Sequence, residues 1–386
     1  MHPAVPVSSI DAATLGDQPH DRTTPLIIRG GARDWPATQR WTPAELASRV
    51  AGRRVPIAAS RQGLFDYVAP DTADAATVTE MPFDEAVRLI CDRQPGGLVH
   101  YLQQGSIPDL FPELRADLRV PDGIDRPELI VSVSLWLGAA GCVTKLHYDM
   151  ADNYLVQVQG RKRFLVFNPD QHALLYAAED TEHGTKSRAD FQQPDEERFP
   201  LLRQARPMEA VVEPGDILYL PAFWWHEVET LEAAISVNYW WKAPIVRGLC
   251  PAGLFYMRGA HAAGGLADQL LSHTDSRGFA SSLDMAQFCL GHKHQAAAVL
   301  IAAATLEAHL LRLGAGRPDA ETGSGSRPTL TELAGRLGNT NHAIDVETRT
   351  EWGELVDLAM RSDPGDERRV TAFVTGVELY LAWNPA

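Results

Sequence analysis

Between about Leu129 and Lys242 the sequence is a succession of short, β-rich segments with no helical stretch between them. The segments are LIVSVSLWLG, NYLVQVQG, RKRFLVFNP, EAVVEPGDILYLP, WWHEVET and AAISVNYWW, with Gly, Pro, Asn or Asp at their boundaries. Several alternate in polarity, as strands do when one face meets a core. Many short strands without intervening helices indicate a sandwich or barrel rather than a parallel α/β sheet. Gln159 and Gly160 predict a hairpin between the second and third segments.

The segment before this β region has helical character. In WTPAELASRVAG, Thr42 can cap a helix, Pro43 takes its first position, and Glu45 completes a capping box. A second helix is expected from near Pro82, in PFDEAVRLICD, and β-branched and aromatic residues make the following VHYLQQ a strand.

The β-rich segments stop near residue 242, and the rest of the chain is rich in Ala and Leu. MAQFCLGHKHQAAAVLIAAATLEAHLLRLG predicts helix, GAGRPDAETGSGSRP predicts a flexible linker, and ELVDLAM and VTAFVTGVELYLAW predict closing helices. We therefore expect a β domain with N-terminal helices over residues 1–244 and a helical region over residues 245–386.

Charge and cysteine content narrow the functional classes. A formal net charge of −15 argues against a nucleic-acid backbone as the main partner, because such binding depends on clustered Lys and Arg. The four cysteines form no CxxC pair, which argues against a zinc knuckle or a disulfide framework and favours a reduced, cytoplasmic setting. We see no signal peptide at the N-terminus and no run of eighteen apolar residues, so we expect no membrane span.

The tripeptide His147-Tyr148-Asp149 lies in the β-rich context TKLHYDMADNYLVQV. Residues two apart on a strand point to the same face, so His147 and Asp149 can both project into a barrel. His226 lies 79 residues later, in the strand-like run PAFWWHEVE. Two histidines and one carboxylate form the facial triad of non-haem iron(II) oxygenases, which leaves coordination positions open for other ligands.

A His-x-Asp pattern by itself has little specificity in a chain with 13 histidines and 50 acidic residues. His273-Thr274-Asp275 has the same pattern, but it lies in a helical segment without strand context, and we reject it. The context of His147 is different: a β-rich frame, a second histidine on another strand-like run, and a basic residue between them.

That basic residue is Lys162, in QGRKRFLVF. Arg161 and Arg163 alternate with it, so a strand would turn both arginines to the face opposite Lys162, where solvent can reach them. A buried ammonium without an anionic partner is costly, so an inward-facing lysine on a core strand predicts an anionic ligand. Thr144, three residues before His147, could supply a hydroxyl to the same ligand.

The runs SLWLGAAGCVTKLHYDMADNYLVQVQGRKRFLVFNPDQ, EPGDILYLPAFWWHEVE and ISVNYWWK resemble the JmjC/cupin-like iron(II)- and 2-oxoglutarate-dependent hydroxylases. Within that family the likeness is greatest to the asparaginyl hydroxylase that regulates hypoxia-inducible factor, and it extends from about Pro25 to Lys242. The resemblance implies a double-stranded β-helix (jelly-roll) barrel, mainly β with helices, followed by a helical C-terminal region. It also implies that His147, Asp149 and His226 bind iron(II), with 2-oxoglutarate as cosubstrate and O₂ as oxidant.

The resemblance implies roles for five further residues around the cosubstrate. Lys162, Thr144 and Tyr101 would hold the distal carboxylate of 2-oxoglutarate. Asn153 and Asn238 match positions that line the cosubstrate and the metal-bound water.

On the substrate side, Gln103 and Trp240 match positions near the substrate and the metal. The chain departs from the family at residues 183–190, within an insertion over residues 176–200, and in its longer C-terminal region. Because those parts would select the substrate, its identity does not follow from the resemblance.

The resemblance favours an amino-acid side chain of a peptide or protein as the substrate, with hydroxylation as the reaction. A small metabolite is the first alternative, and a non-catalytic cupin that serves as an interaction module is a more remote one. Hydroxylation of a tRNA base and histone-type demethylation are weaker still. The C-terminal helices are expected to form a homodimer interface, as in the resembling hydroxylases, with an intrachain lid or a docking surface as alternatives.

Overall fold

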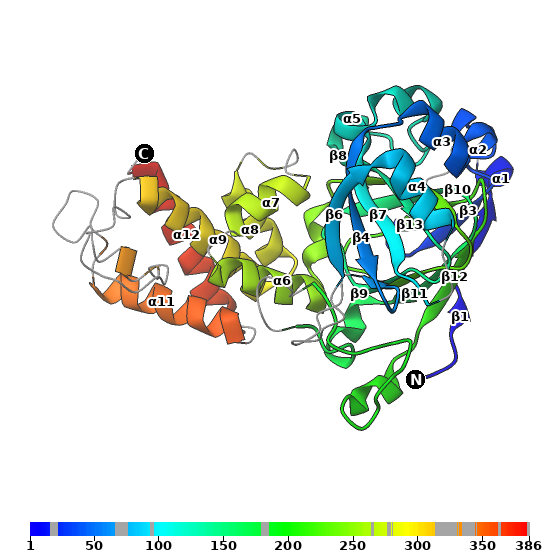
Figure 1. Ribbon diagram of the computed structural model, residues 1–386. Helices are drawn as coiled ribbons and strands as arrows, with labels where there is room; N and C mark the ends of the chain where they lie inside the picture. The colour runs from blue at the N-terminus through cyan, green and yellow to red at the C-terminus, as the bar shows by residue number, and fades with distance from the viewer. Residues whose placement is uncertain are drawn as a thin grey trace. The chain divides into compact units, whose positions relative to one another are not determined.

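The chain divides into two compact units, Met1–Ala243 and Pro244–Ala386, and Figure 1 labels their helices and strands. All strands of the described residues belong to the first unit. The predicted linker GAGRPDAETGSGSRP lies outside the described residues. The computed structural model describes residues 1–15, 22–65, 76–92, 96–178, 185–263, 266–275, 279, 281–312, 330, 332–333, 344, 346–361 and 364–383.

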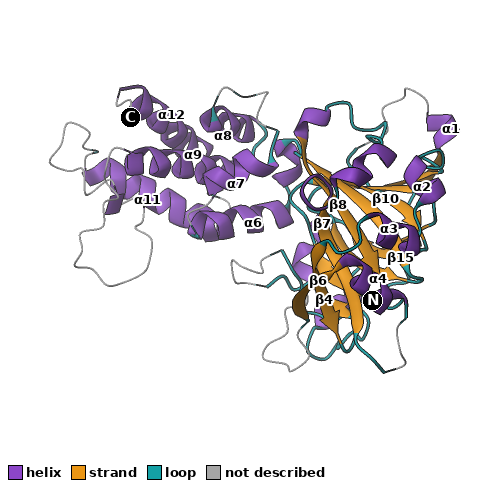
Figure 2. Ribbon diagram, turned by 45° about the horizontal axis from the view of Figure 1, so that its top comes forward, coloured by secondary structure: helices purple, strands orange, loops and turns teal. Residues whose placement is uncertain are grey.

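The strands of the first unit form two sheets, which Figure 2 shows in orange. The smaller sheet has the order β1 (Val5–Pro6), β12 (Met208–Val212), β11 (Lys162–Phe167), β14 (Trp225–Thr230), β9 (Val143–His147) and β5 (Leu64–Phe65). The larger sheet has the order β2 (Ser9–Asp11), β3 (Leu26–Arg29), β13 (Ile217–Leu220), β10 (Asp152–Gln159), β15 (Ala234–Trp241), β8 (Ile130–Gly138), β7 (Val99–Ser106), β4 (Arg54–Ser60) and β6 (Thr77–Pro82).

The eight strands from β8 to β15 are shared between the sheets in a jelly-roll pattern. Strands β8, β10, β13 and β15 lie in the larger sheet, and β9, β11, β12 and β14 lie in the smaller one. Apolar side chains from both sheets, among them Leu155, Leu218, Phe164 and Val166, pack in one cluster between them. The predicted double-stranded β-helix is therefore confirmed.

The predicted hairpin at Gln159-Gly160 is wrong. Strand β10 pairs with β13 and β15, whereas β11 pairs with β12 and β14, so the chain crosses from one sheet to the other at Gly160. Gly160 has a φ of +67°, and a Cβ there would lie 2.3 Å from the carbonyl oxygen of Ala233. Only glycine fits this corner without strain. Local turn chemistry marks a change of direction but does not identify which strands pair across it.

Helices cover the outer face of the larger sheet. Residues on alternate positions of its strands, such as Tyr154 and Tyr239, belong to one core with Trp35, Trp41 and Phe83 from the helical segments. Strands β10 and β15 are thus buried on both faces. The helices are α1 (Ala12–Leu15), α2 (Pro36–Arg40), α3 (Pro43–Arg49), α4 (Phe83–Cys91) and α5 (Ile107–Leu110), with 3₁₀ turns at η1 (Pro112–Asp117), η2 (Pro127–Leu129), η3 (Pro169–Leu174) and η4 (Pro200–Gln204).

The second unit is helical and has a core of its own. The predicted continuous helix over MAQFCLGHKHQAAAV is broken after Gly291, because Lys293 takes a φ of +62° between two helices. Among the described residues of the chain, no helix is both long enough and apolar enough to cross a membrane. The elements are η5 (Ile245–Gly248), α6 (Pro251–Ala262), α7 (Leu266–His273), α8 (Ser282–Gly291), α9 (Gln295–Leu310), α11 (Val346–Arg361) and α12 (Glu367–Trp383).

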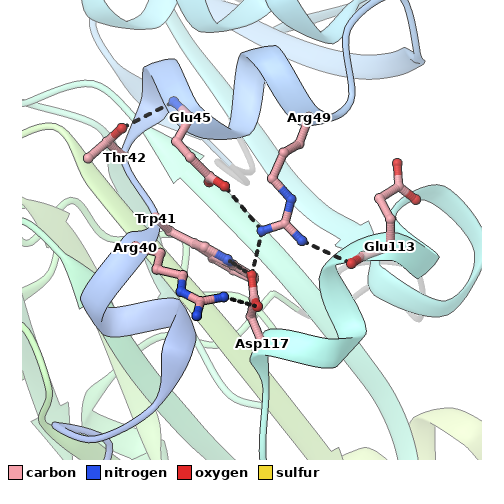
Figure 3. Close-up of polar contacts among 7 residues, drawn as sticks. All are labelled: Arg40, Trp41, Thr42, Glu45, Arg49, Glu113 and Asp117. Carbon is pink, nitrogen blue, oxygen red and sulfur yellow. Dashed lines mark hydrogen bonds and ion pairs between the residues drawn. The ribbon is translucent and has the colours of Figure 1, made fainter.

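A buried carboxylate fixes helix α3 to the 3₁₀ turn η1 (Figure 3). Asp117 accepts a hydrogen bond from Trp41 Nε1 at 2.8 Å and another from the guanidinium of Arg49. Thr42 caps the helix, as predicted, by accepting from the amide of Glu45. Burial acts to raise the pKa of Asp117, but the hydrogen bonds and positive charge of Arg49 outweigh it, so the pKa lies below its ordinary value.

Replacing this carboxylate is expected to destabilise the fold. Asp117→Asn removes the buried counter-charge of Arg49, which keeps only the more exposed Glu45, and we expect the free energy of unfolding at pH 7 to fall by about 1–3 kcal/mol. Since the folded pKa is lowered, the stabilisation is present above pH 3.8 and is lost as the pH falls through the lowered value. Urea unfolding at pH 7 and pH 3 measures both effects. Glu80→Gln, at an exposed ion pair, is the control, and an equal loss in both variants would contradict the account.

Candidate metal centre

His147, Asp149 and His226 lie together at one end of the barrel. His147 ends β9, Asp149 lies two residues further on, beyond the end of the strand, and His226 lies opposite His147 on the neighbouring strand β14. One potential ligand atom from each residue lies within 4.8 Å of the other two. The two imidazole centroids are 4.3 Å apart, and His226 Nε2 is 3.9 Å from Asp149 Oδ2. This is the one such cluster of His, Cys, Asp and Glu side chains found among the residues that the structure describes.

Backbone carbonyls orient both imidazoles. Nδ1 of His147 lies 2.7 Å from the carbonyl oxygen of Lys145, and Nδ1 of His226 lies 3.0 Å from that of Trp224. A proton on each Nδ1 satisfies these contacts and leaves Nε2 with its lone pair free for a metal. Burial and the nearby His147 lower the pKa of His226 to about 4, against the opposing effect of Asp149. The His226 imidazole is therefore neutral at neutral pH, as a metal ligand must be.

A bulge in β9 allows both Thr144 and His147 to face the interior. Residues three apart on a regular strand point to opposite faces. Here His226 pairs with His147 and Val228 pairs with Thr144. Between these two pairs β9 therefore contains one residue more than β14. The extra residue restores the inward direction of Thr144. Sequence spacing alone gave no reason to expect both side chains on one face.

The outer side of this bulge carries a polar cluster in which two members are buried. Lys145 donates to Asp190 at 2.5 Å, and Gln192 donates to Glu227 at 2.7 Å. Lys145 and Glu227 are both almost completely buried, and burial raises the pKa of Glu227. Asp190 and Gln192 belong to the predicted insertion. These hydrogen bonds therefore attach the insertion to the outer face of β9 and β14, the two strands that carry the histidines.

The insertion also adds a short strand beside His147. The amide of Ser187 donates to the carbonyl of Leu146 at 2.9 Å, and the amide after His147 donates back to the insertion at 3.0 Å. These bonds flank an antiparallel bridge between His147 and Lys186. In such a pair the two side chains point to the same face, so Lys186 lies beside the metal centre. The 183–184 part of the predicted departure lies outside the described residues.

A cavity extends from the histidines into the space between the sheets. Its apolar walls include Leu155, Phe164 and Val228, and its polar lining contains all the residues predicted for the cosubstrate. The complete lining is Tyr101, Trp136, Thr144, His147, Asn153, Leu155, Lys162, Phe164, His226, Val228 and Asn238.

Lys162 lies in this cavity and is completely buried. Its Nζ donates to Ser236 Oγ at 2.8 Å and, weakly, to the hydroxyl of Tyr101 at 3.4 Å. In the described part of the chain no carboxylate forms an ion pair with it. Burial lowers the pKa of Lys162 to about 8. A buried ammonium without a counter-charge fits the distal carboxylate of 2-oxoglutarate. As predicted, Arg161 and Arg163 point the other way, to acidic residues at the surface.

The two predicted asparagines face each other across strands β10 and β15. Nδ2 of Asn238 donates to Oδ1 of Asn153 at 3.1 Å. Oδ1 of Asn238 is buried and has no hydrogen-bond partner among the described residues. A buried amide oxygen of this kind needs a donor, and a bound ligand or water can supply one.

The two residues predicted for the substrate side have different positions. Trp240 Nε1 donates to Asp149 Oδ2 at 2.9 Å, so this side chain orients the carboxylate of the metal cluster. Gln103 lies where the register of β7 against β8 shifts, between Leu102 and Gly105, and it does not line the cavity.

Sequence reasoning missed a partner of Lys162, Ser236, and a residue of the cavity lining, Trp136. Ser236, the closest partner of Lys162, lies two positions before Asn238 on β15, and alternation along that strand would have indicated it. Trp136 lies opposite Ser236 on β8. A tryptophan in a β-rich run is usually a packing residue, and nothing in its local sequence distinguished it.

The comparisons with known proteins agree with this geometry. A model of the cupin-like domain matches residues 14–246. Lysine-specific demethylase 8 of Xenopus tropicalis is 31% identical over 223 residues, which are 56% of this chain and 48% of that protein. tRNA wybutosine-synthesizing protein 5 of Gallus gallus is 30% identical over 260 residues, 62% of this chain and 78% of that protein. Bifunctional peptidase and (3S)-lysyl hydroxylase JMJD7 of Homo sapiens is 30% identical over 242 residues, which are 56% of this chain and 77% of that protein. The chain thus spans about half the length of the demethylase.

The hydrogen bond from Trp240 to Asp149 gives a prediction about metal affinity. Trp240→Phe keeps the ring but removes the donor, so we expect the affinity for Mn(II) to fall about tenfold. Trp241→Phe is the matched control, because Trp241 packs on Tyr154 and Tyr219 in the core of the other face. Calorimetric titration of each apoprotein with Mn(II) measures the change. Equal affinities for the wild type and Trp240→Phe would show that the bond does not support the metal centre.

Proposed function

The chain belongs to the cupin-like domain family, and on this premise we propose that it is an iron(II)- and 2-oxoglutarate-dependent oxygenase that hydroxylates an unactivated C–H bond. One observation carries the proposal. The same cavity holds His147 and His226 of the His-Asp-His cluster at one end and, further in, the buried Lys162, which forms no ion pair with a carboxylate of the described residues. A non-catalytic cupin has no need for both features, and a buried ammonium is costly to keep without an anion.

The residues of the chain have separable tasks in this proposal. His147, Asp149 and His226 hold iron(II) from one side and leave the remaining positions open. Bound there with 2-oxoglutarate, the metal would activate O₂ and couple oxidation of the cosubstrate to succinate and CO₂ with hydroxylation of the substrate. Lys162 and its neighbours bind the distal carboxylate of the cosubstrate.

The surroundings of the metal centre favour access from one side. His226 is buried, whereas His147 and Asp149 are partly exposed. The open side of the cluster therefore faces the part of the surface beside Lys186, which we call the rim. Apolar walls further in, including Phe164 and Val228, limit the water that can reach the reaction.

We propose a side chain of a peptide or protein as the substrate, with a small metabolite as the first alternative. The short strand of the insertion lies beside His147, where an extended peptide could run along the rim. Relatives named as lysine demethylase and lysyl hydroxylase act on lysine by their names, whereas another is named for tRNA wybutosine synthesis. The net charge of −15 disfavours tRNA here. The special likeness to the asparaginyl hydroxylase and the cytoplasmic location stay predictions.

Substrate-stimulated succinate formation tests the substrate class. We expect members of a peptide library that contains lysine and asparagine to stimulate turnover, and mass spectrometry to find a gain of one oxygen in the peptide. The same assay is run with small amines and acids and with bulk tRNA, which represent the competing substrate classes. Stimulation by a metabolite or by tRNA but by no peptide would contradict the peptide proposal and leave the oxygenase proposal in place.

Lys162 predicts that cosubstrate binding depends on pH. In the empty cavity its pKa is about 8, and a bound carboxylate raises it again. Binding of 2-oxoglutarate should therefore take up a proton above pH 8 and weaken as the pH rises, whereas below pH 8 the ammonium is already charged. Calorimetry of the metal-loaded protein at pH 8.5, in buffers of different ionisation enthalpy, measures the uptake. Lys162→Arg stays charged and should show none, and equal heats for the wild type in all buffers would contradict the role of Lys162.

We also propose that the helical region over Pro244–Ala386 mediates homodimerisation. The support is its separate apolar core and the exposure of Leu379 on α12, which leaves an apolar side chain for a partner to cover. Light scattering should give twice the chain mass of 42.3 kDa. Leu379→Glu should shift the mass toward that of one chain, and a monomeric wild type would overturn the proposal.

A further inference from the structure

The indole N–H of Trp136 is a buried donor without a hydrogen-bond partner. Trp136 is 8% exposed, and no acceptor among the described residues lies within hydrogen-bonding distance of its Nε1. Buried polar groups in folded proteins nearly always have a partner, and buried indole N–H groups usually find one. The exception at Trp136 therefore needs an explanation.

The fold satisfies the indole N–H groups of other tryptophans in the first unit. Trp41 donates to Asp117, Trp224 donates to a backbone carbonyl, and Trp240 donates to Asp149. Trp136 and Trp225 are the two described tryptophans with a buried, unpartnered N–H. Of these two, Trp136 lines the cavity and Trp225 does not.

Trp136 lies at the lysine end of the cavity. It pairs across the sheet with Ser236, which accepts the hydrogen bond from Lys162. The Nζ atom of Lys162 is 5.8 Å from the centroid of the Trp136 ring, and that ring packs on Tyr101 with centroids 5.6 Å apart. The indole, the phenol and the ammonium thus occupy one corner.

The polar atoms of this corner are mainly donors. Lys162 has three N–H groups, Trp136 has one, and the hydroxyls of Tyr101 and Thr144 can each donate one more. A carboxylate offers about four lone-pair positions, so it matches such a corner better than any neutral group does.

We propose that Trp136 is a cosubstrate-binding residue whose indole N–H donates to the distal carboxylate of 2-oxoglutarate, beside Lys162. This inference rests on the proposed function. It adds a neutral donor to the charged ammonium and makes the corner selective for keto acids with a second carboxylate. Keto acids without that group gain nothing from Trp136.

Calorimetry with two keto acids tests this selectivity in the Zn(II)-loaded full chain. 2-Oxoglutarate carries the distal carboxylate and pyruvate lacks it. Trp136→Phe keeps an aromatic ring and removes the N–H, so we expect the preference for 2-oxoglutarate over pyruvate to fall about tenfold, with pyruvate affinity unchanged. Trp225→Phe removes the other unpartnered N–H and should leave the preference as in the wild type.

The outcomes separate the two proposals. If metal-loaded wild type binds no 2-oxoglutarate, the proposed function itself fails. If the wild type binds it and Trp136→Phe keeps the full preference, only the role of Trp136 is overturned. An equal loss in Trp225→Phe would also overturn it, because the effect would then be a general response to losing a tryptophan.

Nuclear magnetic resonance of the wild type avoids the risk that a variant misfolds. The chain has nine tryptophans and therefore nine indole N–H signals. With Zn(II) bound, one signal should move downfield on addition of 2-oxoglutarate and stay in place on addition of pyruvate. Identical responses to both keto acids would contradict the hydrogen bond.

Discussion

Strands β9 and β14 pair so that His147 lies directly opposite His226, and the rest of the site depends on this register. A slip of one residue would turn one imidazole to the outer face and dismantle the cluster. The bulge in β9 holds the register and also brings Thr144 inward. On the outer face the buried Lys145 pairs with the partly exposed Asp190 of the insertion, so a slip would also break this ion pair and leave a buried ammonium unpaired.

The cavity changes in character along its length. At the rim, His147 and Asp149 are partly exposed and lie beside the short strand of the insertion. At the inner end, Lys162 and its neighbours form a corner of donors enclosed by apolar walls. In the proposed function this arrangement separates two tasks: the inner corner would bind the anionic cosubstrate, and the rim would receive the substrate. The two sheets can hold this polar interior because helices bury the opposite face of the larger sheet.

The residues that could be predicted from the sequence are those that depend on strand alternation and residue chemistry. His147, His226 and Lys162 lie where alternation along their strands places them. The succession of short strands indicated a sandwich or barrel, and the resemblance to the JmjC/cupin-like hydroxylases narrowed this to a jelly roll. The pairing of strands was not predictable, because Gly160 marks a corner between sheets as readily as a hairpin. The partners of a buried side chain, such as Ser236, come from strands distant in sequence and become visible only in the fold.

Anaerobic titration of the apoprotein with Fe(II) and 2-oxoglutarate, followed by absorption spectroscopy, tests the central claim most directly. The account predicts a weak visible metal-to-ligand charge-transfer band that is absent from His147→Ala. In Lys162→Met the band should need a much higher concentration of 2-oxoglutarate, since the metal ligands are intact and only the anchoring ammonium is gone. A wild-type protein that binds the metal but shows no band at any concentration of 2-oxoglutarate would contradict the account.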